Sequence, residues 1–297
     1  MLSEEWIDWV RENLARGCTR ESLMLEMLRN NISSEDTLQA FRDAAEAPHA
    51  EVTHVPCWPE RFVFRSCNQA TIDGREIRVL ARLQRPAAVL LENVLSATEC
   101  EALIALSSQR MTPSTVVDPE SGELAPVQAR SSEGTWFARG AEALIARIET
   151  RLAQIMDVPV AHGEGLQVLH YRVGGEYRPH HDYFPPDARG SARHMREGGQ
   201  RTASLILYLN DVEAGGETIF PLCQAAFVPR RGRALYFAYC DPTGRLDPAS
   251  LHGGAPVEAG EKWIATKWVR QRAYGVRPED GLAVAANART HLDGEAA

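Results

Sequence analysis

Two histidines and one aspartate are spaced in this sequence in a way that suits a metal site. His180 and Asp182 are separated by one residue, and His252 follows in a distant segment. Two imidazoles and one carboxylate that face one metal leave coordination positions open, an arrangement diagnostic of non-haem Fe(II) oxygenases. The pattern therefore predicts a mononuclear iron site.

The two nearby ligands lie in strand-like sequence. Alternate side chains of a β-strand point to the same face, so His180 and Asp182 face one way and His181 faces the other. The third ligand has to come from a distant strand. This requirement predicts a site shared between two parts of a sheet.

Three histidines follow Asp182 in the sequence, and only one of them is followed by a residue that supports a role in a cofactor site. His194 lies in a loop rich in glycine and arginine, and His291 lies in a tail without a strand pattern. His252 is followed by Lys262, which opens the last predicted strand. A lysine there suits a dicarboxylate that chelates the metal at one end. We therefore prefer His252 as the third ligand.

The elements around these residues predict an α+β protein. Short apolar segments separated by Gly, Pro and Asp predict a β-sandwich or barrel. The predicted strands cover residues 77–82, 87–92, 166–171, 202–209, 218–220, 225–228, 233–239 and 263–269. Helices are predicted within 3–46, from a capping box at Ser96 and Glu99, and over 141–156. Residues 112–128 are predicted to form a mobile loop.

Four segments follow from this pattern. They are a helical unit over 1–46, a proline-containing linker over 47–76, a catalytic domain over 77–275 and a tail over 276–297. We expect the helical unit to dock on the main domain, or to contact a partner or a second copy.

Composition excludes several classes of protein. Hydrophobic residues make up 44% and charged residues 24% of the chain, ordinary values for a globular protein with a sizeable core. The net charge of -8 argues against a nucleic-acid binder. No apolar run approaches the ~20 residues that span a membrane. The acidic start Met1-Leu2-Ser3-Glu4-Glu5 is unlike a signal peptide, so we expect a cytoplasmic protein with reduced cysteines.

From about residue 86 to residue 270, the chain resembles the prolyl 4-hydroxylase family of Fe(II)- and 2-oxoglutarate-dependent dioxygenases. The resemblance rests on ordered motifs, chiefly Tyr177-x-x-His180-x-Asp182, Tyr208-Leu209-Asn210-Asp211-Val212, Gly215-Gly216-Glu217-Thr218 and Gly260-Glu261-Lys262-Trp263. It implies a double-stranded β-helix, or jelly-roll barrel, flanked by helices. It also implies Fe(II), 2-oxoglutarate and O2 as reactants, with ascorbate as reductant.

The resemblance assigns roles to individual residues. It implies that His180, Asp182 and His252 bind iron. For 2-oxoglutarate, it implies a salt bridge from Lys262 and contacts from Tyr171 and Ser204. For a peptide groove, it implies Arg130, Ser132, Glu164, Tyr177 and Trp268. The loop over 185–200 follows the first two iron ligands, and its position suggests a flap over the site.

These assignments imply hydroxylation of a prolyl residue in a peptide or protein, with release of succinate and CO2. Hydroxylation of a free amino acid, or of another peptidyl residue, uses the same cofactor residues and stays open. A third hypothesis is a metal-binding scaffold without activity, which Lys262 and the intact triad disfavour. The net negative charge of the chain argues against a nucleic-acid substrate.

Overall fold

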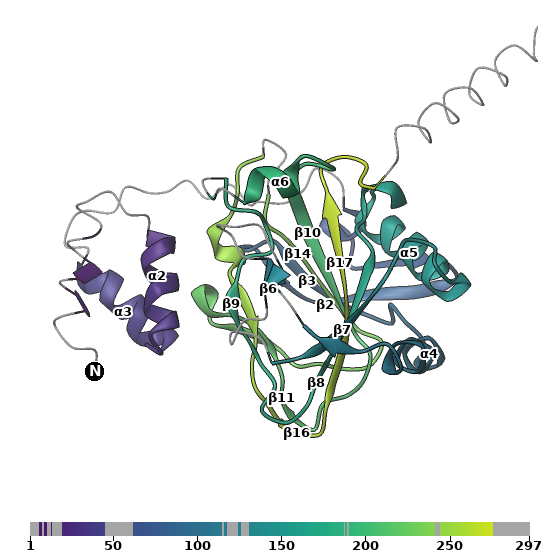
Figure 1. Ribbon diagram of the computed structural model, residues 1–297, viewed down its shortest axis with the longest axis horizontal. Helices are drawn as coiled ribbons and strands as arrows, with labels where there is room; N and C mark the ends of the chain where they lie inside the picture. The colour runs from purple at the N-terminus through teal and green to yellow at the C-terminus, as the bar shows by residue number, and fades with distance from the viewer. Residues whose placement is uncertain are drawn as a thin grey trace, which may run out of the picture.

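Two β-sheets lie against each other in the middle of the molecule, and helices pack on the outside (Figure 1). This computed structural model describes residues 6, 7, 9, 10, 13, 20–44, 62–114, 116, 117, 124, 125, 131–186, 188, 190–240 and 244–275. The arrangement is a jelly roll with flanking helices, so the predicted fold class is confirmed.

The larger sheet has nine strands, all paired antiparallel. In spatial order they are β1 (Gln69–Ile72), β2 (Arg75–Leu83), β3 (Ala88–Glu92), β14 (Ala234–Ala238), β10 (Arg201–Tyr208), β17 (Lys262–Arg270), β8 (Leu166–Tyr171), β7 (Glu133–Phe137) and β4 (Thr112–Pro113). Neighbours such as β10 and β17 are far apart in sequence, so only the folded chain brings their side chains together.

The smaller sheet carries the predicted histidine ligands. Its strands are β13 (Ala225–Phe227), β12 (Thr218–Phe220), β15 (His252–Gly254) and β9 (Tyr177–His180). Two further pairs are β11 (Ala214–Gly215) with β16 (Val257–Ala259), and β5 (Val116–Val117) with β6 (Leu124–Ala125).

The central strand β17 divides its side chains between two compartments, because neighbouring residues of a strand point to opposite faces. One face packs into the core beneath the helices through Trp263, Ala265 and Val269. The other face lines a large cavity between the sheets through Lys262, Ile264, Thr266 and Trp268. The alternation of a single strand thus separates core from site.

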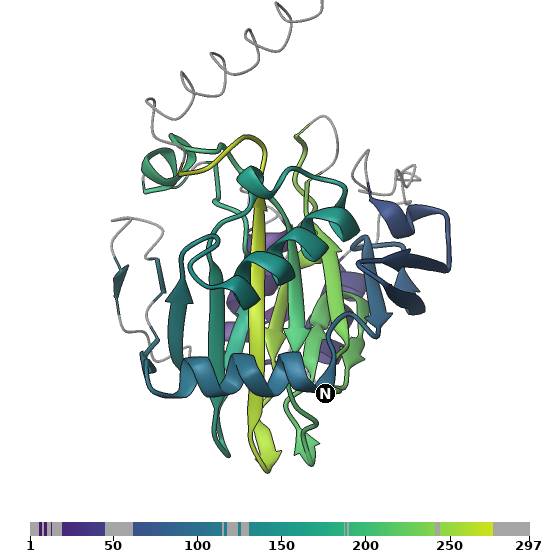
Figure 2. The same cartoon turned by 90° about the vertical axis from the view of Figure 1, so that its right-hand side faces the viewer.

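Helices cover the outer face of the large sheet (Figure 2). α4 (Ala97–Ser108) begins with the predicted capping box, in which the Glu99 amide donates to Ser96 Oγ at 3.1 Å. α5 (Ala143–Met156) buries Ile148 and its neighbours in the core, as its apolar period predicts. The shorter helices of the described chain are α6 (Ser191–Met195), η1 (Val63–Arg65), η2 (Val160–His162), η3 (Pro221–Cys223) and η4 (Pro248–Ser250), and they are not confined to this face.

The N-terminal helices form a small core of their own. α2 (Arg20–Arg29) and α3 (Ser34–Ala44) pack Leu23, Met27 and Phe41 around Val10. Helical structure within 3–46 is therefore confirmed for the described residues. None of the described helices is both long and apolar enough to cross a lipid bilayer.

Two predictions about irregular segments are wrong in part. The predicted linker over 47–76 contains η1 and β1, and Phe62 and Phe64 are buried in the main core. A buried aromatic pair gives these residues a reason to be ordered that proline content does not reveal. Within 112–128, the described residues include three strands of two residues each, β4, β5 and β6, which we did not predict. Residues 47–61 and the predicted tail over 276–297 lie outside the described residues.

Candidate metal centre and its cavity

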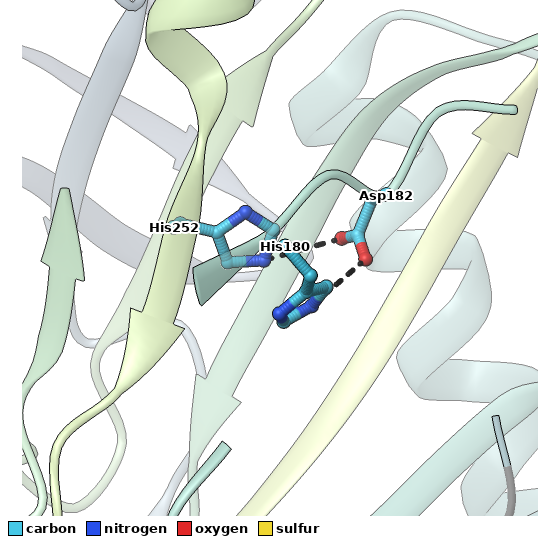
Figure 3. A group of neighbouring side chains, drawn as sticks. All are labelled: His180, Asp182 and His252. Atoms are coloured by element: carbon cyan, nitrogen blue, oxygen red, sulfur yellow. Dashed lines mark ion pairs between the residues drawn. The ribbon is translucent and has the colours of Figure 1, made fainter. Parts of the chain in front are cut away.

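The two predicted histidine ligands come from paired strands. His252 on β15 lies opposite His180 on β9 in the antiparallel register. Asp182 lies two positions beyond the end of β9, in a bend rather than in the strand we predicted. The bend still turns its carboxylate toward both rings (Figure 3). The structure therefore brings the three predicted ligands together.

The distances suit one metal ion. Nε2 of His180 lies 3.5 Å from Oδ1 of Asp182, and Nε2 of His252 lies 3.6 Å from Oδ2. One ligand atom from each of the three residues lies within 4.8 Å of the others. Among the residues that the structure describes, this is the one group of three or more potential metal ligands that meets this limit.

Backbone carbonyls orient both imidazole rings. His180 Nδ1 lies 2.9 Å from the Arg178 carbonyl, and His252 Nδ1 lies 3.0 Å from the Ser250 carbonyl. A carbonyl can only accept, so each Nδ1 carries the proton and each Nε2 keeps a free lone pair toward Asp182. This is the tautomer a metal ligand needs, and the donor set fits Fe(II).

Burial sets the protonation states at the site. Burial lowers the pKa of His252 to about 3, despite the opposing attraction of Asp182. Burial alone would raise the pKa of Asp182, but His252, His180 and Arg201 outweigh it and hold that pKa below its usual range. A neutral imidazole beside an ionised carboxylate is the state that binds a divalent metal.

Lys262 lies in the same cavity, which has a volume of about 830 Å³. Its side chain is 3% exposed, and its Nζ lies 5.4 Å from the ring centre of Tyr171, its register partner on β8. Burial lowers its pKa to about 8, with weak opposition from Glu217. Within the described part of the chain, no carboxylate forms an ion pair with this ammonium group. A buried cation without a partner suits an anionic ligand.

Comparisons with known proteins agree with this chemistry. Residues 166–270 match the model of the 2OG-Fe(II) oxygenase superfamily. Probable prolyl 4-hydroxylase 3 of Arabidopsis thaliana is 42% identical over 210 residues, which cover 64% of this chain and 71% of that protein. Prolyl 4-hydroxylase 5 of the same plant is 40% identical, with 64% and 70% covered.

This chain belongs to the prolyl 4-hydroxylase family. It is a dioxygenase that depends on Fe(II), 2-oxoglutarate and O2. Among solved structures, the viral collagen prolyl hydroxylase of Paramecium Bursaria Chlorella virus-1, in a 2-oxoglutarate complex, is 30% identical. That match covers 62% of this chain and 95% of the viral one, with a TM-score of 0.49.

Aromatic rings line the cavity of this prolyl 4-hydroxylase family member beside the metal centre. Tyr177 stacks on His180, with ring centres 3.6 Å apart. Trp268 stacks on the half-exposed Trp136 at 5.5 Å, and the guanidinium of Arg201 lies 4.2 Å from the Trp268 ring centre. Tyr177 and Trp268 therefore both line the cavity, and their role in substrate binding stays a prediction.

The structure places Ser204 elsewhere than we predicted. Its side chain is fully buried, and its hydroxyl lies 2.5 Å from Oδ2 of Asp182 instead of lining the cavity. Ser204 therefore donates to the carboxylate of Asp182, and it does not belong to the lining of the cavity in which 2-oxoglutarate is expected.

Glu164 also departs from the prediction. It is buried outside the cavity lining and accepts hydrogen bonds from Arg201 at 2.7 and 2.9 Å and from Arg270 at 2.5 Å. Burial raises its pKa, but the two guanidinium groups outweigh burial and lower it. Glu164 therefore contacts Arg201, and Arg201 in turn lines the cavity. Ser132 lies outside this cavity and donates to Ser114 Oγ at 2.9 Å, and Arg130 lies outside the described residues.

Several cavity residues escaped the sequence analysis. Arg201 received no role, although its place directly before the predicted strand over 202–209 was a usable signal. Thr218 and Thr266 add hydroxyl groups to the lining. Leu25 and Arg29 of the N-terminal α2 also line the cavity, and no local pattern in the sequence indicates this.

Proposed function

We propose that this protein hydroxylates a prolyl residue in a peptide or protein. The observation that carries the proposal is one cavity that holds the His180, Asp182 and His252 cluster, a buried Lys262 without an ion pair to any described residue, and a wall of aromatic rings. The names of the curated relatives indicate proline as the target.

Each group of residues has a separate task. His180, Asp182 and His252 would hold Fe(II), at which O2 would oxidise 2-oxoglutarate to succinate and CO2 with one oxygen atom and hydroxylate the substrate with the other. Lys262, with Tyr171 beside it, would bind the far carboxylate of 2-oxoglutarate and so fix its orientation.

The aromatic walls hold the substrate and keep water away. Tyr177 and Trp268 contribute aromatic rings beside the metal ligands, and aromatic walls suit the compact apolar ring of proline and the extended backbone of proline-rich chains. Placing the target C–H bond in a dry cavity limits side reactions of the oxidant. We include ascorbate in this proposal as the reductant, and the cytoplasmic location stays a prediction.

Succinate formation tests the proposal. Protein loaded with Fe(II) without oxygen is opened to air with 2-oxoglutarate and ascorbate, with and without a proline-rich peptide. We expect the peptide to stimulate succinate release, and we expect a +16 Da product that maps to proline. His252→Ala is the control for metal-dependent turnover.

Other outcomes select among the alternatives. Succinate release without peptide stimulation would move the substrate to free amino acids, and a hydroxyl on another residue would replace proline as the target. Bound iron without turnover under any condition would leave only a scaffold role.

A further inference from the structure

Helix α2 has two functional faces. Leu23 and Met27 point into the small N-terminal core. Glu21, Leu25 and Arg29 are spaced four residues apart, so they form one continuous stripe along the helix. This stripe combines an acidic, an apolar and a basic side chain and does not belong to the buried N-terminal core, so packing within that core does not account for it.

This stripe faces the catalytic cavity. α2 packs against β9, the strand that carries His180 (Figure 1). α3 packs against η3. Leu25 and Arg29 line the same cavity as the predicted iron ligands. The N-terminal unit therefore completes one wall of the site.

The charge of the cavity lining differs from that of the whole protein. The chain has a net charge of -8. Among the described residues, however, the lining contains four cations, Arg29, Arg178, Arg201 and Lys262, and Asp182 as its one carboxylate. Arg201 is already paired with Glu164, and Lys262 is proposed to bind 2-oxoglutarate. In the part of the chain that the structure describes, Arg178 and Arg29 make only longer ion pairs at exposed positions, with Glu176 at 3.7 Å and Glu26 at 3.6 Å, so these two cations remain for the substrate.

The charge of Arg29 is available to a ligand. Its side chain is 61% exposed, and the ion pair it makes with Glu26 spans 3.6 Å between neighbours on one helix turn. Such exposed pairs contribute at most about 1 kcal/mol, so an incoming carboxylate can replace Glu26 at little cost. The apolar Leu25 one turn earlier suits the stem of the same substrate segment.

We propose that α2 is a substrate-selecting wall: Leu25 and Arg29 contact the residues that flank the target proline, and Arg29 favours an acidic side chain there. This inference rests on the proposed prolyl hydroxylation. It assigns the N-terminal unit to substrate choice and predicts that good substrates are acidic, proline-containing peptides.

The test uses the full chain and a matched peptide set. The peptides share one proline-rich sequence and differ in whether Glu or Lys occupies each of three positions on either side of the proline. For every position, kcat/KM is measured from the +16 Da product, and the ratio of the Glu peptide to the Lys peptide is taken. Since each ratio comes from one enzyme preparation, it is independent of the active fraction.

We expect the wild-type protein to prefer Glu at one or more positions. Arg29→Glu should lower that ratio about fivefold or more, because it replaces a surface attraction by a repulsion. Arg29→Gln should give an intermediate value. Arg78→Glu is the matched control: Arg78 is 59% exposed, pairs with Glu76 and lies outside the cavity lining, so it should keep the wild-type ratio.

Two results would overturn the inference while leaving the proposed function intact. The first is an Arg29→Glu ratio equal to that of Arg78→Glu. The second is an equal gain for all peptides in Arg29→Glu, which would make α2 a cover instead of a selector. If the wild-type protein hydroxylates proline in no peptide, the proposed function itself fails and this inference fails with it.

Discussion

Two buried lysines on one strand show how this protein separates stability from function. Lys262 and Lys267 both lie on β17, and they are 3% and 2% exposed. Lys267 faces the helices, where it forms a 2.5 Å ion pair with Glu149 of α5 and donates to the Glu164 carbonyl. Lys262 faces the cavity and makes no ion pair with any described residue.

The difference follows from strand geometry. Five positions separate the two lysines, an odd number, so their side chains point to opposite faces of the sheet. Burying a charge is unfavourable unless it is paired. Among the described residues, Lys267 has a carboxylate partner in Glu149, and Lys262 has none. The unpaired, buried ammonium group of Lys262 therefore indicates where an anionic ligand binds. The predictions below test this contrast, from the largest expected effect to the smallest.

The metal ligands on the cavity side should dominate catalysis. His252→Ala removes one of three ligands, and we expect turnover to fall by at least about a thousandfold, because the chemistry depends on the metal. Iron binding, measured by metal analysis after gel filtration, should fall in parallel, while circular dichroism stays native. Full iron occupancy in the variant would show that His252 is not a ligand.

The helix-side lysine should dominate stability. Lys267→Met leaves the buried Glu149 carboxylate without its cation, and we expect the free energy of unfolding in urea to fall by about 3–5 kcal/mol. Adding Glu149→Leu should recover much of this loss, because the stranded charge is then gone. Unchanged KM for 2-oxoglutarate in the folded variant would support the contrast with Lys262, and a large rise would break it.

The cavity-side lysine should show the reverse behaviour. Lys262→Met should raise KM for 2-oxoglutarate about a hundredfold, because a desolvated charge pair with the co-substrate is lost. The free energy of unfolding should stay equal or rise, since no protein carboxylate loses its partner. A stability loss as large as that of Lys267→Met would contradict the assignment of Lys262 as a ligand contact.

Ser204 lies beneath the metal ligands, and its substitution separates two roles. Ser204→Ala removes the hydroxyl that bonds Asp182, so we expect metal affinity to fall about tenfold. The dissociation constant of 2-oxoglutarate at saturating Mn(II) should change little. A larger effect on 2-oxoglutarate than on metal would restore the role that the sequence predicted. Ser204→Thr keeps the hydroxyl and serves as the control.

The lowered pKa of Lys262, about 8, predicts two opposite pH dependences. Above about pH 8 the empty site loses its positive charge, so affinity for 2-oxoglutarate should fall, approaching tenfold per pH unit. The unfolded lysine titrates near about 10.5, so the unfolded chain binds more protons between these values. The contribution of this group to the stability of the ligand-free protein therefore rises from about pH 8 to about 10.5.

Calorimetric titration of 2-oxoglutarate into the Mn(II)-loaded protein measures the first dependence. Lys262→Arg keeps its charge throughout this range and should lack the fall in affinity above pH 8. The same fall in both proteins would place the titrating group elsewhere.

Local sequence determined much of this architecture. The period of α5, the capping box of α4 and the short apolar strands each depend on neighbouring residues, and all appear as predicted. The candidate metal ligands could also be predicted from the sequence. Two of them are separated by one residue, and the lysine that follows His252 indicated the third.

Other features depend on contacts between distant segments, and local pattern does not encode them. The linker prediction missed Phe62 and Phe64, whose order comes from burial in the main core. Glu164 and Ser204 were assigned to ligands, but the fold gives each a buried protein partner on another segment, Arg201 and Asp182.

The sequence by itself thus determined the fold class, the donor set and the lysine that suits an anion, because residue type and spacing carry that information. Only the tertiary structure decided which charges are satisfied, since pairing depends on what lies across the sheet. It also placed α2 at the mouth of the cavity, a contact between segments that are far apart along the chain. Lys262 and Lys267 look alike in sequence, and the face of the sheet each one occupies makes the difference.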